Sequence, residues 1–240
     1  MGRAHEVRAA AMAKTAAVKT KVYSKFGREI YMAAKSGVPD PEMNLTLKHT
    51  IEKAKAAQVP TDVIKRNIEK AKDSGSASYM PAQYEGFGPG NSTLIVDVLT
   101  DNMNRSYSEV KGCFTKMHCN IGNKGSVSFN YQTLGVLEYE GDEEETALDA
   151  LVSAEVDVKD LKAVDGEMTI YVAPTDLYKA KDVIDKLHPE LNYDTCEIRM
   201  IPNEIISFSS PEEMESFKKL LGFLDDLDDV QNVYHNVKMF

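Results

Sequence analysis

The chain has 240 residues, of which 42% are hydrophobic, and its 28 Lys and Arg against 38 Asp and Glu give a formal net charge of −10 at pH 7. This apolar content is enough to build buried cores and excludes a wholly disordered chain. No apolar run approaches the roughly 20 residues of a membrane-spanning helix, and no signal-peptide core opens the chain, so we expect a cytoplasmic protein without a membrane partner. The three cysteines form no CxxC pair, which predicts no disulfide framework.

The charge is distributed unevenly along the chain. Residues 1–72 carry 15 basic and 7 acidic side chains, residues 73–133 carry 4 and 5, residues 134–203 carry 6 and 18, and residues 204–240 carry 3 and 8. A basic end on an acidic body is typical of proteins that bind a polyanion at that end. The sequence therefore predicts a nucleic-acid partner for the amino-terminal segment.

This basic segment has the apolar periodicity of helices. Residues 4–18 are rich in alanine, with little to bury, so we expect a loosely held helix or arm there. Beyond them, apolar residues recur at steps of three and four, which predicts three helices, the second starting near Pro41 and the third opened by Pro60. The residues expected in the three buried faces are Val22, Phe26, Ile30, Ala33 and Gly37, then Met43, Leu47, Ile51 and Ala54, and finally Ile64, Ile68 and Ala71.

Basic residues follow the same steps on the side opposite the first buried face. Lys21, Lys25, Arg28 and Lys35 fall within a stripe about 80° wide, which we call the cationic ridge. Exposed lysines often serve solubility, but the rest of this chain already has a large acidic excess, so a binding role is favoured. The residues expected to contact phosphates are Arg3, Arg8, Lys14, Lys19, Lys21, Lys25, Arg28 and Lys35, with Asn104, Arg105 and Lys124 as additional candidates.

After residues 73–90, which are predicted to be a linker and turn, strands alternate with helices. Residues 94–99 form an apolar strand, a Ser106/Glu109 capping box opens a helix, and residues 127–131 alternate as a half-buried strand. Residues 134–203 then show the order β-α-β-β-α-β, a split βαβ unit. A second capping box, at Ser210 and Glu213, opens a helix that is followed by a strand near residues 230–237.

These elements predict an α+β protein. An all-helical amino-terminal domain is followed by two ferredoxin-like α/β domains, one inserted in the other. The expected boundaries are residues 1–75 for the basic helical domain, residues 79–133 plus 204–240 for the discontinuous middle domain, and residues 134–203 for the acidic insert.

Residue patterns that would indicate catalysis or metal binding all have simpler explanations. Gly86, Gly88 and Gly90 precede a strand, whereas a dinucleotide fingerprint follows one, so a turn is favoured. Residues 120–126 lack the order of a P-loop, and Cys113, His118 and Cys119 lack zinc spacing. Residues 225–229 lack the Gly and distal Glu of an EF-hand and are expected to form a solvated acidic turn. We therefore expect no metal and no cofactor.

His235 is the remaining candidate for catalysis. It could act with Asp228 or Asp229, but the sequence places no Ser or Cys nucleophile beside it. An enzymatic function is thus the weakest of the hypotheses, and a non-enzymatic binding protein is expected.

Five ordered motifs resemble successive motifs of the YebC family, most closely its YeeN-type branch, and together they span essentially the whole chain. They are residues 25–30 (KFGREI), residues 51–60 (IEKAKAAQVP), residues 84–90 (YEGFGPG), residues 99–105 (LTDNMNR) and residues 229–236 (DVQNVYHN). The resemblance implies a helical domain followed by two α/β domains, and a DNA-binding transcriptional regulator. The alternative that it implies is a translation factor that binds rRNA or tRNA on the ribosome and relieves stalling at proline-rich stretches. The acidic domains would then stay off the polyanion and could hold a protein partner.

Overall fold

The structure is a computed structural model that describes residues 2–73 and 79–239, with side chains described from residue 18 onward. Its contacts divide into two compact units. The first comprises Met1–Tyr84, Val96–Ile121 and Ser210–Val233, and the second comprises Glu85–Ile95, Gly122–Ser209 and Tyr234–Phe240.

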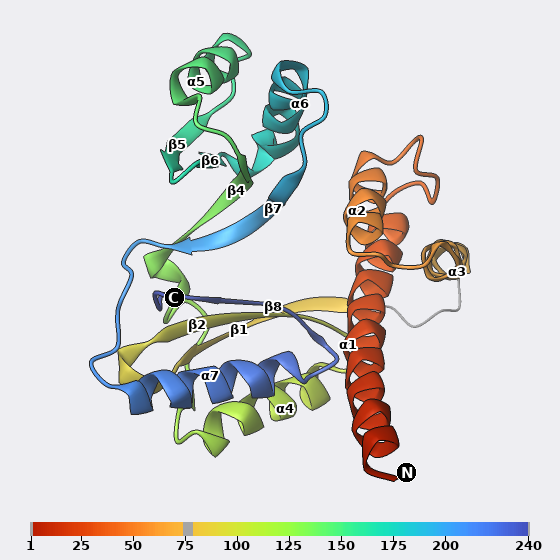
Figure 1. Ribbon diagram of the computed structural model, residues 1–240, viewed down its shortest axis with the longest axis vertical. Coiled ribbons are helices and arrows are strands. Elements are labelled where there is room, and N and C mark those ends of the chain that lie inside the picture. Colours follow the sequence, from red (N-terminus) through yellow and green to blue (C-terminus); the bar gives the residue numbers. More distant parts are fainter. Residues whose placement is uncertain (1, 74–78, 240) are drawn as a thin grey trace. The chain divides into compact units, whose positions relative to one another are not determined.

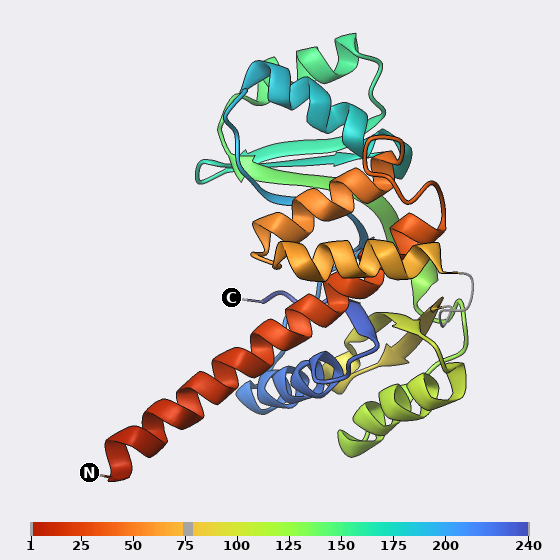
Figure 2. The same cartoon turned by 90° about the vertical axis from the view of Figure 1, so that its right-hand side faces the viewer.

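The basic segment forms α1 (Gly2–Lys35), α2 (Leu45–Ala56) and α3 (Thr61–Lys72), and α2 and α3 pack on the carboxy-terminal half of α1 (Figures 1 and 2). The expected boundary between an alanine-rich arm and a following helix is absent, because no Gly or Pro interrupts residues 4–26. The candidate residues Arg3, Arg8 and Lys14 lie on the backbone of α1, but their side chains are outside the described residues.

The helical core confirms most of the predicted buried faces. Ile30, Leu47 and Ala54 are fully buried, whereas Met43, which was expected in the core, is 73% exposed. Met43 lies outside α2 because Asn44 is the N-cap residue, and its side chain accepts a hydrogen bond from the Leu47 amide at 3.0 Å.

The absence of a side chain at Gly27 brings α1 and α3 close together. A Cβ atom there would lie 2.9 Å from the side-chain nitrogen of Asn67 on α3. Gly27 therefore leaves room for the Asn67 side chain between the two helices, and a larger residue at this position would force Asn67 aside.

The first sheet contains β1 (Met80–Phe87), β2 (Thr93–Thr100), β3 (Asn120–Ile121) and β8 (Val230–His235) in the order β3-β1-β2-β8. The helices α4 (Met103–Lys116) and α7 (Pro211–Asp225) lie side by side on one face of it (Figure 1). This is the ferredoxin-like spatial order, with β1 in the place of the third strand of the motif.

Two predictions for this sheet are wrong. Residues 80–87, expected to be part of a linker, form β1, whose alternation is obscured by its Pro and Gly. Residues 127–131, expected to be a strand of this sheet, form a 3-10 turn, Ser128–Asn130, and Tyr131 begins a strand of the other sheet. The helix α4 also starts earlier than expected, because the Asn102 side chain caps it and Ser106 is buried inside it.

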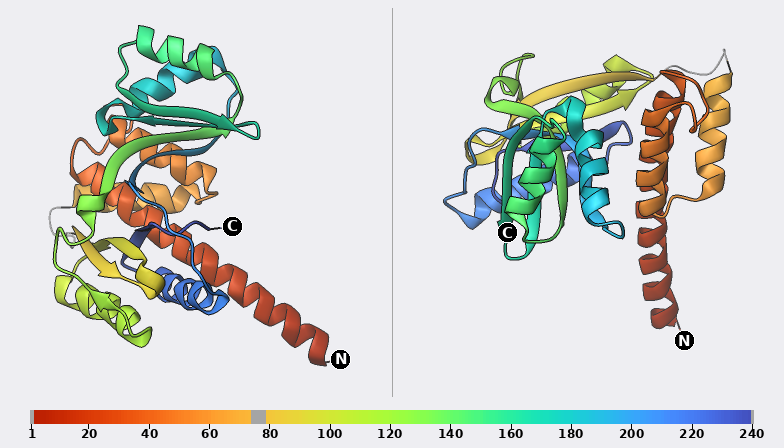
Figure 3. Two further views of the ribbon diagram at one scale, coloured as in Figure 1. Left: turned by 90° about the vertical axis from the view of Figure 1, so that its left-hand side faces the viewer. Right: turned by 90° about the horizontal axis from the view of Figure 1, so that it is seen from above.

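The second sheet lies between β3 and α7 in the chain. Its strands β4 (Tyr131–Glu140), β5 (Val158–Val164), β6 (Glu167–Val172) and β7 (Tyr193–Pro202) follow the antiparallel order β5-β6-β4-β7. The helices α5 (Glu144–Ser153) and α6 (Leu177–Leu187) cover one face (Figure 3). The predicted α+β class with one ferredoxin-like element set inserted into another is confirmed, while the domain boundaries stay a prediction.

The predicted cap of α7 is present, and its contribution can be measured. The Ser210 side chain accepts a hydrogen bond from the Glu213 amide at 3.2 Å, and Pro211 occupies the first turn. Replacing Ser210 with alanine should cost about 1 kcal/mol of helix stability. Faster amide exchange in the first turn of α7, with no change in α4, is the expected measurement, and equal exchange in the two proteins would contradict it.

Candidate nucleic-acid interface

The cationic ridge lies on α1 where the helix is fully described. Lys21, Lys25 and Arg28 follow one another at steps of four and three, so their side chains leave the same side of the helix. The opposite side packs on α2 and α3 through residues such as Phe26 and Ile30. The predicted separation into an apolar face and a basic face is therefore present on this helix.

Three ridge residues, Lys21, Lys25 and Arg28, are largely covered by the segment Asp225–Asp229 at the carboxy-terminal end of α7, which we call the acidic segment. Lys21 Nζ lies 2.8 Å from Asp225 Oδ2 and 3.8 Å from Asp226 Oδ1. Lys25 Nζ lies 3.2 Å from Asp225 Oδ1. Both lysine side chains are only about one-fifth exposed, at 20% and 22%, so the acidic segment covers the ridge as well as neutralising it.

The next ridge residue has three partners. Arg28 lies 3.2 Å from Asp229 Oδ1 and donates a hydrogen bond to the Asp228 carbonyl oxygen, and its guanidinium lies 5.5 Å from the ring centroid of Tyr79. Its side chain is 14% exposed. Arg28 is therefore part of the folded framework as much as of a binding surface.

Asp229 is the buried centre of this contact. Asp229 is 4% exposed. In addition to its ion pair with Arg28, it accepts hydrogen bonds from Thr100 Oγ1 at 2.7 Å and from Arg105 at 2.8 Å. Arg105, an additional candidate for nucleic-acid binding, is also bound to Asp101 at 2.8 Å, and these two carboxylates raise its pKa above the usual range. Asp229 thus contradicts the expected solvated acidic turn at one of its positions.

The Asp225 carboxylate is ionised at neutral pH. Partial burial would raise the pKa of Asp225, but hydrogen bonds and charge from Lys21 and Lys25 outweigh it, so the pKa lies below its ordinary value of 3.8. The Asp225 and Asp226 side chains remain 65% and 84% exposed. The carboxylate oxygens that pair with Lys21 and Lys25 are therefore accessible to solvent, although the lysines themselves are mostly covered.

The remaining predicted site residues are scattered over the described structure. Lys19 is exposed on α1, and Lys35 is exposed at its end, where it donates to the Asp73 carbonyl oxygen at 3.3 Å. Asn104 is exposed on α4, and Lys124 is exposed on the loop before β4.

Further exposed basic residues lie on α2 and α3, and they are not among the residues predicted to contact phosphates. These residues are Lys48, Lys55, Lys65, Arg66, Lys70 and Lys72. Lys48 and Lys55 are seven residues apart, which places them on one face of α2, and this spacing is visible in the sequence. The positive surface of the helical region is therefore wider than the cationic ridge.

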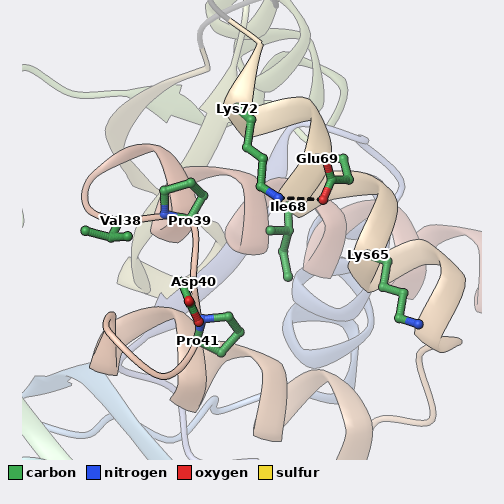
Figure 4. Close-up of a pocket in the computed structure, with 8 residues that line it drawn as sticks. All are labelled: Val38, Pro39, Asp40, Pro41, Lys65, Ile68, Glu69 and Lys72. Carbon is green, nitrogen blue, oxygen red and sulfur yellow. Dashed lines mark hydrogen bonds and ion pairs between the residues drawn. The ribbon is translucent and has the colours of Figure 1, made fainter.

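A hollow of about 620 Å³ opens between α3 and the loop that joins α1 to α2 (Figure 4). Lys72 bends toward Glu69, 2.6 Å away, while Lys65 extends away from the hollow. The other lining residues are Val38, Pro39, Asp40, Pro41 and Ile68. The lining thus combines two prolines and two aliphatic side chains with charged ones, of which Lys72 and Glu69 form an ion pair.

The described residues contain neither a metal-binding cluster nor a membrane-spanning helix. Within residues 18–73 and 79–239, whose side chains are described, no group of three or more His, Cys, Asp and Glu side chains is arranged to hold a metal ion. No helix in the same ranges combines the length and the apolar character needed to cross a bilayer.

Comparison with known families matches nearly the whole chain. Residues 3–74 match the family described as the TACO1/YebC protein N-terminal domain, and residues 79–237 match the TACO1/YebC second and third domain. Proteins named probable transcriptional regulatory proteins are 47% identical in Vibrio parahaemolyticus and 48% identical in Vibrio vulnificus, each over 239 residues and 100% of both chains.

A solved structure has the same fold. The crystal structure of a conserved hypothetical protein from Aquifex aeolicus superposes with a TM-score of 0.79 at 33% sequence identity, covering 91% of this chain and 90% of that one. This protein therefore shares its helical region and its two helix-covered sheets with a protein to which it is 33% identical in sequence.

Proposed function

The chain belongs to the TACO1/YebC family, and from this premise we propose that it is a non-enzymatic, nucleic-acid-binding regulatory protein that holds duplex DNA through its helical region. The printed names of its relatives, probable transcriptional regulatory proteins, favour DNA as the partner. The phosphate contacts would come from the eight predicted basic residues of α1, with support from the exposed cations of α2 and α3.

One observation carries this proposal. Lys21 and Lys25 both reach the same carboxylate, at 2.8 and 3.2 Å, so the ridge already has the spacing to bind neighbouring anionic oxygens. A phosphate group presents the same kind of acceptor, and charge-assisted hydrogen bonds to it have similar lengths. Replacing the acidic segment by a DNA backbone would therefore exchange one set of anionic oxygens for another.

The salt dependence of binding tests the proposal. If about five phosphates are contacted, the logarithm of the affinity for a duplex should fall with the logarithm of salt concentration at a slope of roughly −4 to −5. The double variant Lys21→Gln/Lys25→Gln should make this slope shallower by about 2, because two phosphate contacts are lost. Fluorescence anisotropy with a labelled duplex provides the measurement.

A matched control removes the same charge elsewhere. Lys159 and Lys162 lie on β5 in the second unit, and the Lys159→Gln/Lys162→Gln variant should keep the slope of the unaltered protein. A flat salt response of the unaltered protein would refute duplex binding. Cosedimentation with ribosomes at physiological salt, without affinity for duplex DNA, would refute the choice of DNA.

A further inference from the structure

An exposed aromatic ring stands on the loop that precedes β4. Phe129 is 79% exposed, the largest value among the exposed large hydrophobic side chains of the described residues. Val127 and Tyr131, two positions away on either side, are only 1% and 7% exposed, and the Tyr131 hydroxyl donates to the Thr93 carbonyl oxygen at 3.0 Å. A single exposed apolar side chain is ordinary on a protein surface, but one between two anchored neighbours is held in a defined position.

The loop is also clamped from below by a buried carboxylate. Glu85 is 2% exposed and accepts hydrogen bonds from the amides of Gly125 at 2.7 Å, Val127 at 2.6 Å and Ser128 at 2.8 Å, and from the Ser128 hydroxyl at 3.0 Å. Gly125 has a φ of +89°, which an L side chain rarely adopts. Because the backbone is fixed in this way, the ring of Phe129 can bind a partner with little loss of conformational entropy.

The surroundings of the loop differ in charge from the rest of the second unit. Residues 118–133 contain no Asp or Glu, whereas residues 134–203 contain 18 of them. Lys124 is exposed and precedes Gly125, so it leaves the same clamped loop as Phe129, which follows Ser128. The loop is thus a stretch of this acidic unit that carries an exposed cation and no carboxylate of its own, which favours contact with a polyanion.

Hydrogen-bonding groups and a second ring adjoin the loop. Gln132 donates to Asn203 at 2.7 Å, and Asn203 donates to Asn130 at 3.5 Å. Three side-chain amides are therefore linked in a row that begins at Asn130, the residue after Phe129. Phe87 is 43% exposed, and its ring lies beside Gly122 at the start of the loop. Amide groups pair with the polar edges of bases, and aromatic rings pair with their faces.

We propose that Phe129 is a stacking platform for an unpaired base of a single-stranded nucleic acid, with Lys124 holding an adjacent phosphate. The bases of a duplex are already stacked on both faces, so only an unpaired base offers a face to the ring. This inference rests on the proposed function, because it assumes that the protein meets nucleic acid, and it adds a contact outside the helical region. A protein partner would also use an exposed ring, but the lysine and the absence of carboxylates on the loop fit a polyanion better.

The test compares single-stranded and duplex probes on the full-length protein. The Phe129→Ala variant should weaken binding of an oligodeoxythymidine of about 12 nucleotides by about tenfold, and the Phe129→Trp variant should restore it. Binding of a duplex of the same length should not change. The matched control is Val152→Ala, since Val152 is also exposed, at 60%, but lies on α5.

Each outcome has a defined meaning. Equal losses with oligodeoxyuridine and oligouridine, which differ only in the sugar, would support stacking on the base alone, and a loss confined to one of them would support stacking and assign the sugar as well. Unchanged affinity for both single strands, with duplex binding intact, would overturn the inference and leave the proposed function standing. No binding of any probe by the unaltered protein would overturn both. Thermal melting should show all variants folded, because the altered side chains are exposed.

Discussion

Replacing Glu85 with alanine is expected to lower the free energy of unfolding by about 3 kcal/mol. The substitution removes the acceptor of three backbone amides and one hydroxyl, and no other side chain is bonded to those amides in the described structure. Each buried donor left without a partner costs about 1–3 kcal/mol. Urea unfolding measures the loss, and amide exchange at Gly125, Val127 and Ser128 should show where it arises.

The pH dependence of the Glu85 effect provides a second measurement. Burial would raise the pKa of Glu85, but the hydrogen bonds from Gly125, Ser128 and Val127 outweigh it, so the folded-state pKa lies below the ordinary 4.5. A carboxyl whose pKa is lowered by folding stabilises the protein above its unfolded-state value and loses this contribution as pH falls through the folded-state value. The stability difference between the two proteins should therefore shrink below about pH 4.5.

A matched control distinguishes the clamp from charge in general. Glu140 is exposed at the end of β4, and Glu140→Ala removes the same charge without freeing a buried amide. Its stability should stay within about 0.5 kcal/mol of the unaltered protein. An equal loss in Glu85→Ala and Glu140→Ala would contradict the role given to the hydrogen bonds.

The helices and the second sheet were predictable because their determinants are local. The step of three and four in α2 and α3, and the Ser210 cap of α7, act within a few residues. The same is true of the alternation in β6, where Met168, Ile170 and Val172 are buried. By contrast, β1 was missed because its Pro and Gly are turn-formers, and its place is fixed by pairing with β2 and β3.

The candidate site was predictable only in part, for a related reason. Helical spacing places Lys21, Lys25 and Arg28 on one side of α1, but Lys21 and Asp225 are 204 residues apart, and no local pattern pairs them. The acidic segment was interpreted by itself as solvated, although the excess of basic residues on α1 could have suggested a partner for it. Contacts that join distant segments depend on the whole fold, and a sequence interpreted segment by segment does not contain them.

The pairing of ridge and acidic segment leads to the last prediction, which concerns affinity. If Lys21 and Lys25 bind phosphates, Asp225 and Asp226 must first leave them, so the acidic segment competes with DNA for the ridge. The Asp225→Asn/Asp226→Asn variant removes this competition and the repulsion between the carboxylates and the backbone of the duplex. We expect its affinity for duplex DNA at moderate salt to rise by about tenfold, a modest gain because both side chains are largely exposed.

The salt dependence should separate competition from a general charge effect. Before the variant binds DNA, its two lysines are accompanied by anions from the solvent instead of by carboxylates. These anions are released when DNA binds, so the slope should become steeper by about 1 to 2. The control Asp142→Asn/Glu145→Gln makes the same change in net charge at the start of α5, where both side chains are exposed, and it should leave the slope unchanged. Equal gains in the two variants would mean that net charge alone governs binding. A gain in affinity seen only in the Asp225→Asn/Asp226→Asn variant would mean that the acidic segment at the end of α7 sets how tightly the helical region binds a polyanion.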